Sequence, residues 1–113
     1  MLTYSMPVDL LETESQMLVV VDLPGVSADN LKIELEGAEL NISAQRSSAP
    51  VIGISCLLCE RPQGSFVRRL TLPPSAKGGA WKHSLENGVL RVEITKSFSQ
   101  RPRHLPIIVD RTA

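Results

Sequence analysis

Hydrophobic and polar residues alternate on both sides of an Asn-Gly pair near the end of the chain. Asn87-Gly88 is a strong hairpin signal, because a two-residue primed turn needs positive φ at both central positions and these residues tolerate it. Residues 90–94 after the pair and residues 81–85 before it each alternate with a period of two. This period predicts two half-buried strands whose inner face needs a second sheet to cover it.

The same period recurs along most of the chain, between turn-forming residues. An apolar run ends at Pro24-Gly25, which is typical of a central strand closed by a turn, and Pro73-Pro74 ends another strand. Predicted strands cover residues 8–12, 17–23, 31–35, 40–44, 66–72, 81–85 and 90–94. With strands spaced by about ten residues and no helical period, the sequence predicts an all-β, immunoglobulin-like antiparallel β-sandwich of seven to eight strands with an extended C-terminal tail.

One connection is unusually apolar. Residues 51–59 are apolar apart from Gly53 and Ser55, although they lie between loop residues and Pro62. In so small a domain, the expected cover for such a connection is another subunit.

The chain divides into three parts. Residues 1–7 form a short N-terminal arm, residues 8–96 the sandwich, and residues 97–113 a basic extension that contains the apolar residues 106–109. At 113 residues and 42% hydrophobic composition, we expect one domain with one core.

The longest apolar run, residues 17–21, is too short to span a bilayer, and residues 1–12 lack a secretory leader pattern. We therefore expect a cytoplasmic protein without membrane partners.

Charge is unevenly distributed along a chain of zero net charge. Residues 1–45 contain eight acids and one base, whereas residues 46–113 contain four acids and eleven bases. This asymmetry favours attraction between copies over nucleic-acid binding, since the basic half lacks the interleaved aromatic residues on which bases stack.

Two cysteines form a Cys-x-x-Cys pattern, Cys56 and Cys59. Residues three apart on a strand point to opposite faces, so an internal disulfide is disfavoured, and two ligands do not complete a zinc site. We expect buried or half-buried thiols. An inter-subunit disulfide and a metal shared between subunits are the alternatives.

Catalytic chemistry finds no support in the sequence. It contains no nucleophile elbow, phosphate loop or metal-ligand cluster. Of the two histidines, we expect His104 to be solvated, and neither His83 nor His104 to bind metal or sense pH. We expect neither an enzyme nor a cofactor or metal.

These motifs together resemble the small heat shock proteins, the α-crystallin domain (Hsp20) family. The resemblance covers roughly residues 7–96 and the apolar residues of the tail. In chain order it rests on residues 7–12, 22–26, 40–44, Glu60-Arg61, residues 64–66, Arg68, Leu72-Pro73, residues 87–90 and residues 107–109.

The resemblance implies an ATP-independent chaperone that holds non-native client proteins and assembles from strand-swapped dimers into a homo-oligomer. Residues 54–60 would be the strand donated to the partner's first core strand near residues 8–12, by β-augmentation. The implied dimer interface comprises Val8, Leu10, Ile54, Cys56, Leu57, Leu58, Cys59, Glu60 and Arg68.

The resemblance also implies that the tail docks into a groove between two edge strands. The tail motif is Ile107 and Val109, and the groove residues are Leu31, Ile33, Leu35, Trp81, His83 and Leu85. Trp81 and His83 stand where the family has an aliphatic-any-alanine pattern, so we expect a reshaped groove. The family's arm before the first strand is longer, so we expect a smaller assembly.

Two other functions are compatible with the sequence. The first is an adaptor or co-chaperone that binds a specific folded partner. The second is a short-armed subunit that co-assembles with another small heat shock protein. Suppression of client aggregation would separate the chaperone from the adaptor.

Overall fold

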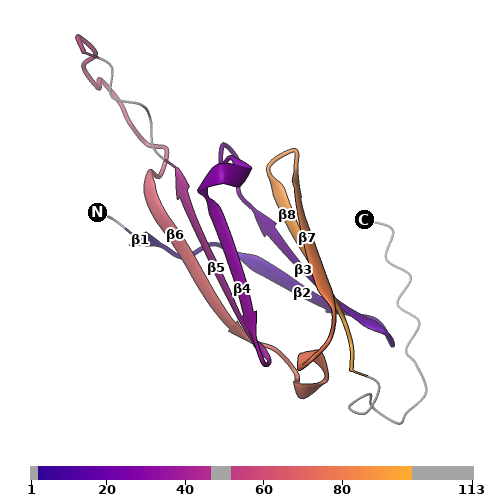
Figure 1. The fold of residues 1–113 in the computed structure, drawn as a ribbon. Coiled ribbons are helices and arrows are strands. Elements are labelled where there is room, and N and C mark those ends of the chain that lie inside the picture. The colour runs from indigo at the N-terminus through magenta and orange to yellow at the C-terminus, as the bar shows by residue number, and fades with distance from the viewer. Residues whose placement is uncertain (1–2, 47–51, 98–113) are drawn as a thin grey trace.

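The predicted fold class is confirmed by the structure, a computed structural model that describes residues 3–46 and 52–97. The described residues form eight strands and two short 3₁₀ turns, η1 (Ala28–Asn30) and η2 (Pro74–Ala76) (Figure 1). The strands are β1 (Thr3–Tyr4), β2 (Val8–Glu12), β3 (Gln16–Asp22), β4 (Leu31–Glu36), β5 (Glu39–Arg46), β6 (Gly64–Thr71), β7 (Trp81–Glu86) and β8 (Val89–Thr95). Among these residues, no helix is long and apolar enough to cross a membrane.

Two four-stranded sheets form the sandwich. The first sheet has the order β1-β6-β5-β4 and the second has the order β2-β3-β8-β7. All neighbours pair antiparallel except β1 and β6, which pair in parallel. Because β1 and β2 are joined by three residues, they lie on one side of the sandwich, and β4 and β7 end the sheets on the other side.

The core lies between the alternating inner faces, as the period of two predicts. The central strands β3, β8 and β5 supply aliphatic side chains that are each at most 2% exposed. These side chains are Met17, Val19, Val21, Leu40, Ile42, Ala44, Leu90, Val92 and Ile94.

The signature turn has the predicted backbone conformation. Asn87 has φ 54° and Gly88 has φ 76°, so both central residues between β7 and β8 occupy the left-handed region. The turn sets Leu85 opposite Leu90 and so places the apolar residues of β7 and β8 on one face.

The structure adds a strand that the sequence pattern did not reveal. Residues 3–4, within the predicted arm, form β1, and the Tyr4 ring stacks on Phe66 with centroids 5.3 Å apart. Met6, also in this segment, is 2% exposed in the core. A strand of two residues is too short to show a period, and contacts distant in sequence hold it in place.

Candidate functional site: open sheet edges and an apolar projecting segment

The edge of the second sheet at β2 is open. Within residues 3–46 and 52–97, β2 pairs on one side with β3, and no strand pairs with its other side. Val8 and Leu10 lie opposite Val21 and Val19, which places both on the inner face. Leu10 is nevertheless 44% exposed. An unpaired strand with an uncovered aliphatic side chain is a site where another strand can add.

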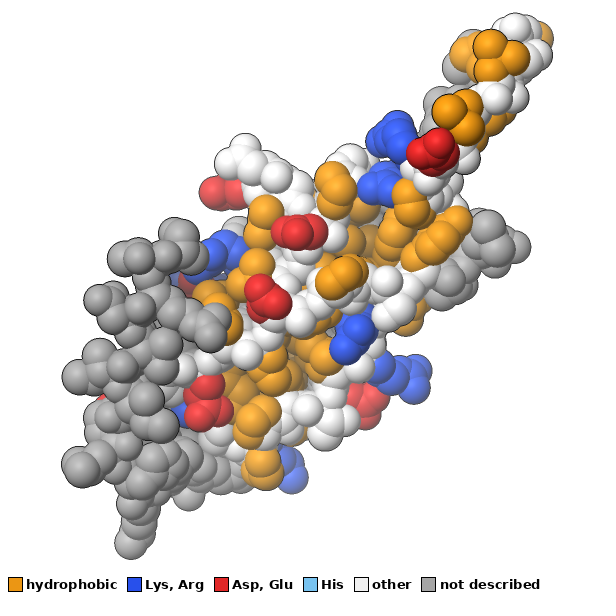
Figure 2. All heavy atoms as spheres, turned by 180° about the vertical axis from the view of Figure 1, so that it is seen from behind, with side chains coloured by type: hydrophobic (Ala, Val, Ile, Leu, Met, Phe, Trp, Pro, Cys, Tyr) orange, Lys and Arg blue, Asp and Glu red, His pale blue; other side chains and the backbone are white. Residues whose placement is uncertain are grey.

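Residues 52–63, which we call the projecting segment, leave the sandwich between β5 and β6. Figure 1 shows this segment extending well beyond the two sheets, and Figure 2 shows hydrophobic side chains along it. Ile54, Leu57 and Leu58 are between 69% and 97% exposed. Residues 54–60 form no strand in this structure.

Cys56 and Cys59 form a disulfide within the chain, so the expectation of buried thiols is wrong. The two Cα atoms lie 6.1 Å apart, within the range that a disulfide spans. The argument against this bond assumed an extended strand, but the chain bends at Leu57. Both cysteines are exposed in the described structure.

Arg46 fixes the base of the projecting segment. Its Nε and Nη2 donate to the carbonyl oxygen of Pro62 at 2.9 and 2.6 Å, and its Nη1 donates to the carbonyl oxygen of Pro24 at 2.6 Å. The guanidinium also lies 5.0 Å from the centroid of the Phe66 ring, which adds a cation–π contact. Sequence reasoning missed Arg46, because its hydrogen-bond partners are backbone carbonyls that no sequence motif marks.

Arg68 lies on the same side of the sandwich as the open β2 edge. It sits opposite Ile42 on the inner face of β6 and is half-buried. Its Nη1 donates to Ser5 Oγ and to the Met6 carbonyl oxygen, both at 3.4 Å. Arg68 therefore ties β6 to the residues that lead into β2.

The six predicted groove residues occupy the opposite side of the sandwich. Leu31, Ile33 and Leu35 lie on the inner face of β4, opposite the buried residues of β5. Trp81, His83 and Leu85 lie on the inner face of β7, opposite the buried residues of β8. The Trp81 and His83 rings are 5.9 Å apart, and both side chains are exposed. The structure thus places these side chains on the inner faces of two edge strands. The tail motif, Ile107 and Val109, and His104 lie outside the described residues.

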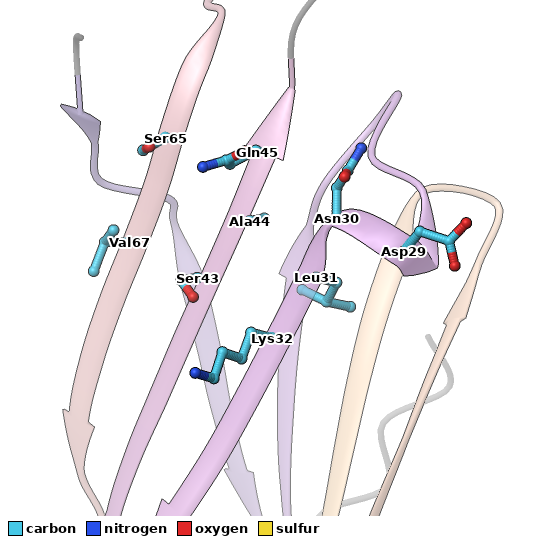
Figure 3. Close-up of a pocket in the computed structure, with 9 residues that line it drawn as sticks. All are labelled: Asp29, Asn30, Leu31, Lys32, Ser43, Ala44, Gln45, Ser65 and Val67. Atoms are coloured by element: carbon cyan, nitrogen blue, oxygen red, sulfur yellow. The ribbon is translucent and has the colours of Figure 1, made fainter.

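The outer faces of the two sheets carry shallow hollows. One, of about 300 Å³, lies over β4, β5 and β6 next to η1 and is lined by mostly polar side chains, including Lys32, Ser43 and Gln45 (Figure 3). Another, of about 460 Å³, lies over β2, β3 and β8 and includes Leu11 and Leu18 beside Arg91 and Glu93. In the described part of the chain, no group of three or more His, Cys, Asp or Glu residues could hold a metal ion.

A two-sheet antiparallel β-sandwich with open edges and a long apolar connection is the architecture of the α-crystallin domain. The profile of the Hsp20/alpha crystallin family matches residues 9–109. The chain belongs to this family, as the resemblance of its motifs implied.

Relatives and solved structures agree with this assignment. The chain is 40% identical over 97 residues to the 16.9 kDa class I heat shock protein 3 of Oryza sativa subsp. japonica, covering 84% of this chain and 65% of the relative. It is 38% identical to the 17.4 kDa class I heat shock protein of Arabidopsis thaliana, covering 84% of this chain and 62% of the relative. The chain thus spans less than two thirds of the length of these relatives.

Two solved structures are similar to this chain in fold and sequence. The structure of hspA from Xanthomonas axonopodis is 30% identical, with a TM-score of 0.71, and the match covers 82% of this chain and 94% of that one. A small heat shock protein from Xylella fastidiosa is 28% identical, with a TM-score of 0.73, and the match covers 92% of this chain and 96% of that one.

Proposed function

We propose that this protein is a cytoplasmic, ATP-independent chaperone, a holdase that binds non-native proteins and prevents their aggregation. Membership of the Hsp20/alpha crystallin family supports this proposal. Two observations carry it, namely the exposure of Ile54, Leu57 and Leu58 on the projecting segment and the open edge of β2. Such incomplete surfaces favour partners recognised by apolar area and main-chain hydrogen bonds rather than by a specific chemistry. The protein acts as a binding protein rather than as an enzyme, and needs no cofactor.

The first joint of the assembly is a strand exchange between two copies. Residues 54–60 of each copy pair with the open edge of β2 in its partner and cover Val8 and Leu10. Burying an Ile or Leu side chain contributes about 1.5–3 kcal/mol, so three on each of two segments supply roughly 9–18 kcal/mol. Association costs about 4–15 kcal/mol. The two ranges overlap, so the strand exchange can be reversed, as a chaperone that exposes apolar surface on heating requires.

Arg68 positions the surface that receives the exchanged strand. Its hydrogen bonds to Ser5 and Met6 hold the segment before β2 against β6. Because this segment leads into the β2 edge, Arg68 sets where that edge lies relative to the first sheet.

The second joint is the docking of Ile107 and Val109 from one dimer between β4 and β7 of another. The inner faces of these strands offer the apolar side chains Leu31, Ile33, Leu35 and Leu85. Burying two aliphatic side chains contributes roughly 3–6 kcal/mol. A single docking event is weak, so many of them are needed to hold a homo-oligomer built from dimers together.

The test is suppression of light scattering from a heat-denatured model client without nucleotide. We expect suppression at near-stoichiometric ratios, with bovine serum albumin at equal mass as the control. No suppression across several clients would refute the holdase and favour an adaptor that binds a specific folded partner. Nucleic acid and anionic vesicles should not co-sediment with the protein.

A further inference from the structure

The disulfide lies inside the segment that our proposed function assigns to strand exchange. We propose that Cys56 and Cys59 form a thiol–disulfide site that controls dimerisation. With the disulfide formed, the chain cannot donate its strand, and reduction by a dithiol releases the strand for exchange. This inference rests on the proposed strand exchange and adds its regulation.

The geometry of the oxidised segment excludes a strand. The Cα atoms of Cys56 and Cys59 are 6.1 Å apart, whereas residues three apart on an extended strand are separated by about 10 Å. The ring closed by the disulfide contains four of the seven residues from 54 to 60. It leaves residues 54–55 before it and Glu60 after it, and neither piece is long enough to form a strand on the partner's β2.

The disulfide also has no evident structural role. A disulfide stabilises a fold mainly by closing a long loop in the unfolded chain, and this one encloses only Leu57 and Leu58. Neither cysteine is part of the core, and both are exposed on the projecting segment. The hydrogen bonds from Arg46 to the Pro62 carbonyl oxygen hold the base of the segment, and both residues lie outside the ring that the disulfide closes. The disulfide can therefore open without disturbing the sandwich.

The reaction is a two-electron thiol–disulfide exchange. A thiolate of a dithiol reductant attacks one sulfur of the Cys56–Cys59 bond, which forms a mixed disulfide and frees the other cysteine. The second thiol of the reductant then attacks the mixed disulfide. The protein gains two S–H bonds in place of its S–S bond, and the reductant leaves as a disulfide.

The reduced segment has the pattern of a strand that can be covered on both faces. In an extended conformation, Ile54, Cys56 and Leu58 fall on one face, and Leu57 and Cys59 fall on the other. A free cysteine packs as a small hydrophobic residue, so both thiols fit the apolar interface. The two cysteines thus contribute to the strand once they are no longer bonded to each other.

The test measures dimer dissociation constants by sedimentation equilibrium, after diamide oxidation and after reduction with dithiothreitol. Intact mass under non-reducing conditions verifies that oxidation removes two hydrogen atoms per chain without joining chains. We expect the reduced protein to dimerise and the oxidised protein to dimerise at least about tenfold more weakly. The matched control, Cys56→Ser with Cys59→Ser, should dimerise with the same dissociation constant in both conditions.

The outcomes separate this inference from the proposed function. Equal dissociation constants for the oxidised and reduced proteins would overturn the redox control and leave strand exchange standing. A reduced protein and a double-serine variant that both stay monomeric would overturn strand exchange, and the redox control with it. Strand exchange and the redox control would also be overturned if the double-serine variant still dimerised when it also carried Leu57→Pro, since pairing would then use another edge. Circular dichroism verifies that this triple variant keeps its strands.

Discussion

An ion pair between a buried lysine and a half-exposed acid links the end of β2 to the residue that follows β8. Lys96, directly after β8, has a side chain that is 2% exposed, and its Nζ lies 3.2 Å from Oε1 of Glu12 at the end of β2. At this distance and an effective dielectric constant of about 20, the two charges attract by roughly 5 kcal/mol. Removing one partner of such a pair leaves a buried charge without compensation, which is strongly destabilising.

Glu12→Gln therefore tests whether this ion pair stabilises the fold. The Glu12 side chain is 48% exposed, so water screens part of the attraction, and the amide oxygen of Gln keeps a hydrogen-bond acceptor. We expect a loss of about 2–3 kcal/mol in the free energy of unfolding. With roughly 4 °C per kcal/mol for a domain of this size, the melting temperature should fall by about 8–12 °C.

A double-mutant cycle isolates the pair. Lys96→Met fills the same space without a charge, so we expect its free energy of unfolding to fall by about 1 kcal/mol or less. The double variant, Glu12→Gln with Lys96→Met, should lose the same amount. The coupling energy should then be about 2 kcal/mol. Urea unfolding is followed by the fluorescence of Trp81, the single tryptophan, at one fixed protein concentration.

Additive losses of stability in the double variant would refute the coupling between Glu12 and Lys96. If the losses from the two single variants sum in the double variant to within about 0.5 kcal/mol, the side chains are not coupled. Glu14→Gln, at an exposed acid in the turn after β2, is the matched control and should change stability by no more than about 0.5 kcal/mol.

Two further predictions concern the projecting segment and the tail. Arg46→Ala should lower the free energy of unfolding by about 0.5–1.5 kcal/mol, since water replaces its donors at the exposed carbonyls of Pro62 and Pro24. Hydrogen exchange should accelerate around both residues, and unchanged exchange there would contradict a role for Arg46 in holding the base of the projecting segment. Ile107→Ala with Val109→Ala should lower the oligomer mass measured by light scattering after size exclusion and leave a folded dimer, and an unchanged mass would mean that the tail does not hold the assembly together.

Most strands could be predicted because their signal is local. Alternation needs only a few consecutive residues, so β2 to β8 fall within one or two residues of the predicted ranges, and Asn87-Gly88 fixed the register of its hairpin. Family motifs then indicated which edges and side chains belong to the candidate site.

The features that sequence reasoning missed share a physical cause, because they depend on contacts that the local pattern does not encode. β1 depends on Tyr4 stacking against a ring far along the chain. Arg46 binds backbone carbonyls, which look the same in every sequence. The error at Cys56 came from assigning extended strand geometry to residues that are bent, with the Cα atoms of Cys56 and Cys59 only 6.1 Å apart.

The two proposed joints lie on opposite sides of the sandwich, and this separation has a consequence for assembly. β2 ends the second sheet on one side, and β4 and β7 end the two sheets on the other. Sites without shared contacts contribute additively to stability. Oxidation of Cys56 and Cys59 would therefore weaken the dimer joint and leave each copy's β4 and β7 free to receive a tail. The product of oxidation should then be single subunits that still carry both halves of the tail joint, rather than unfolded chains.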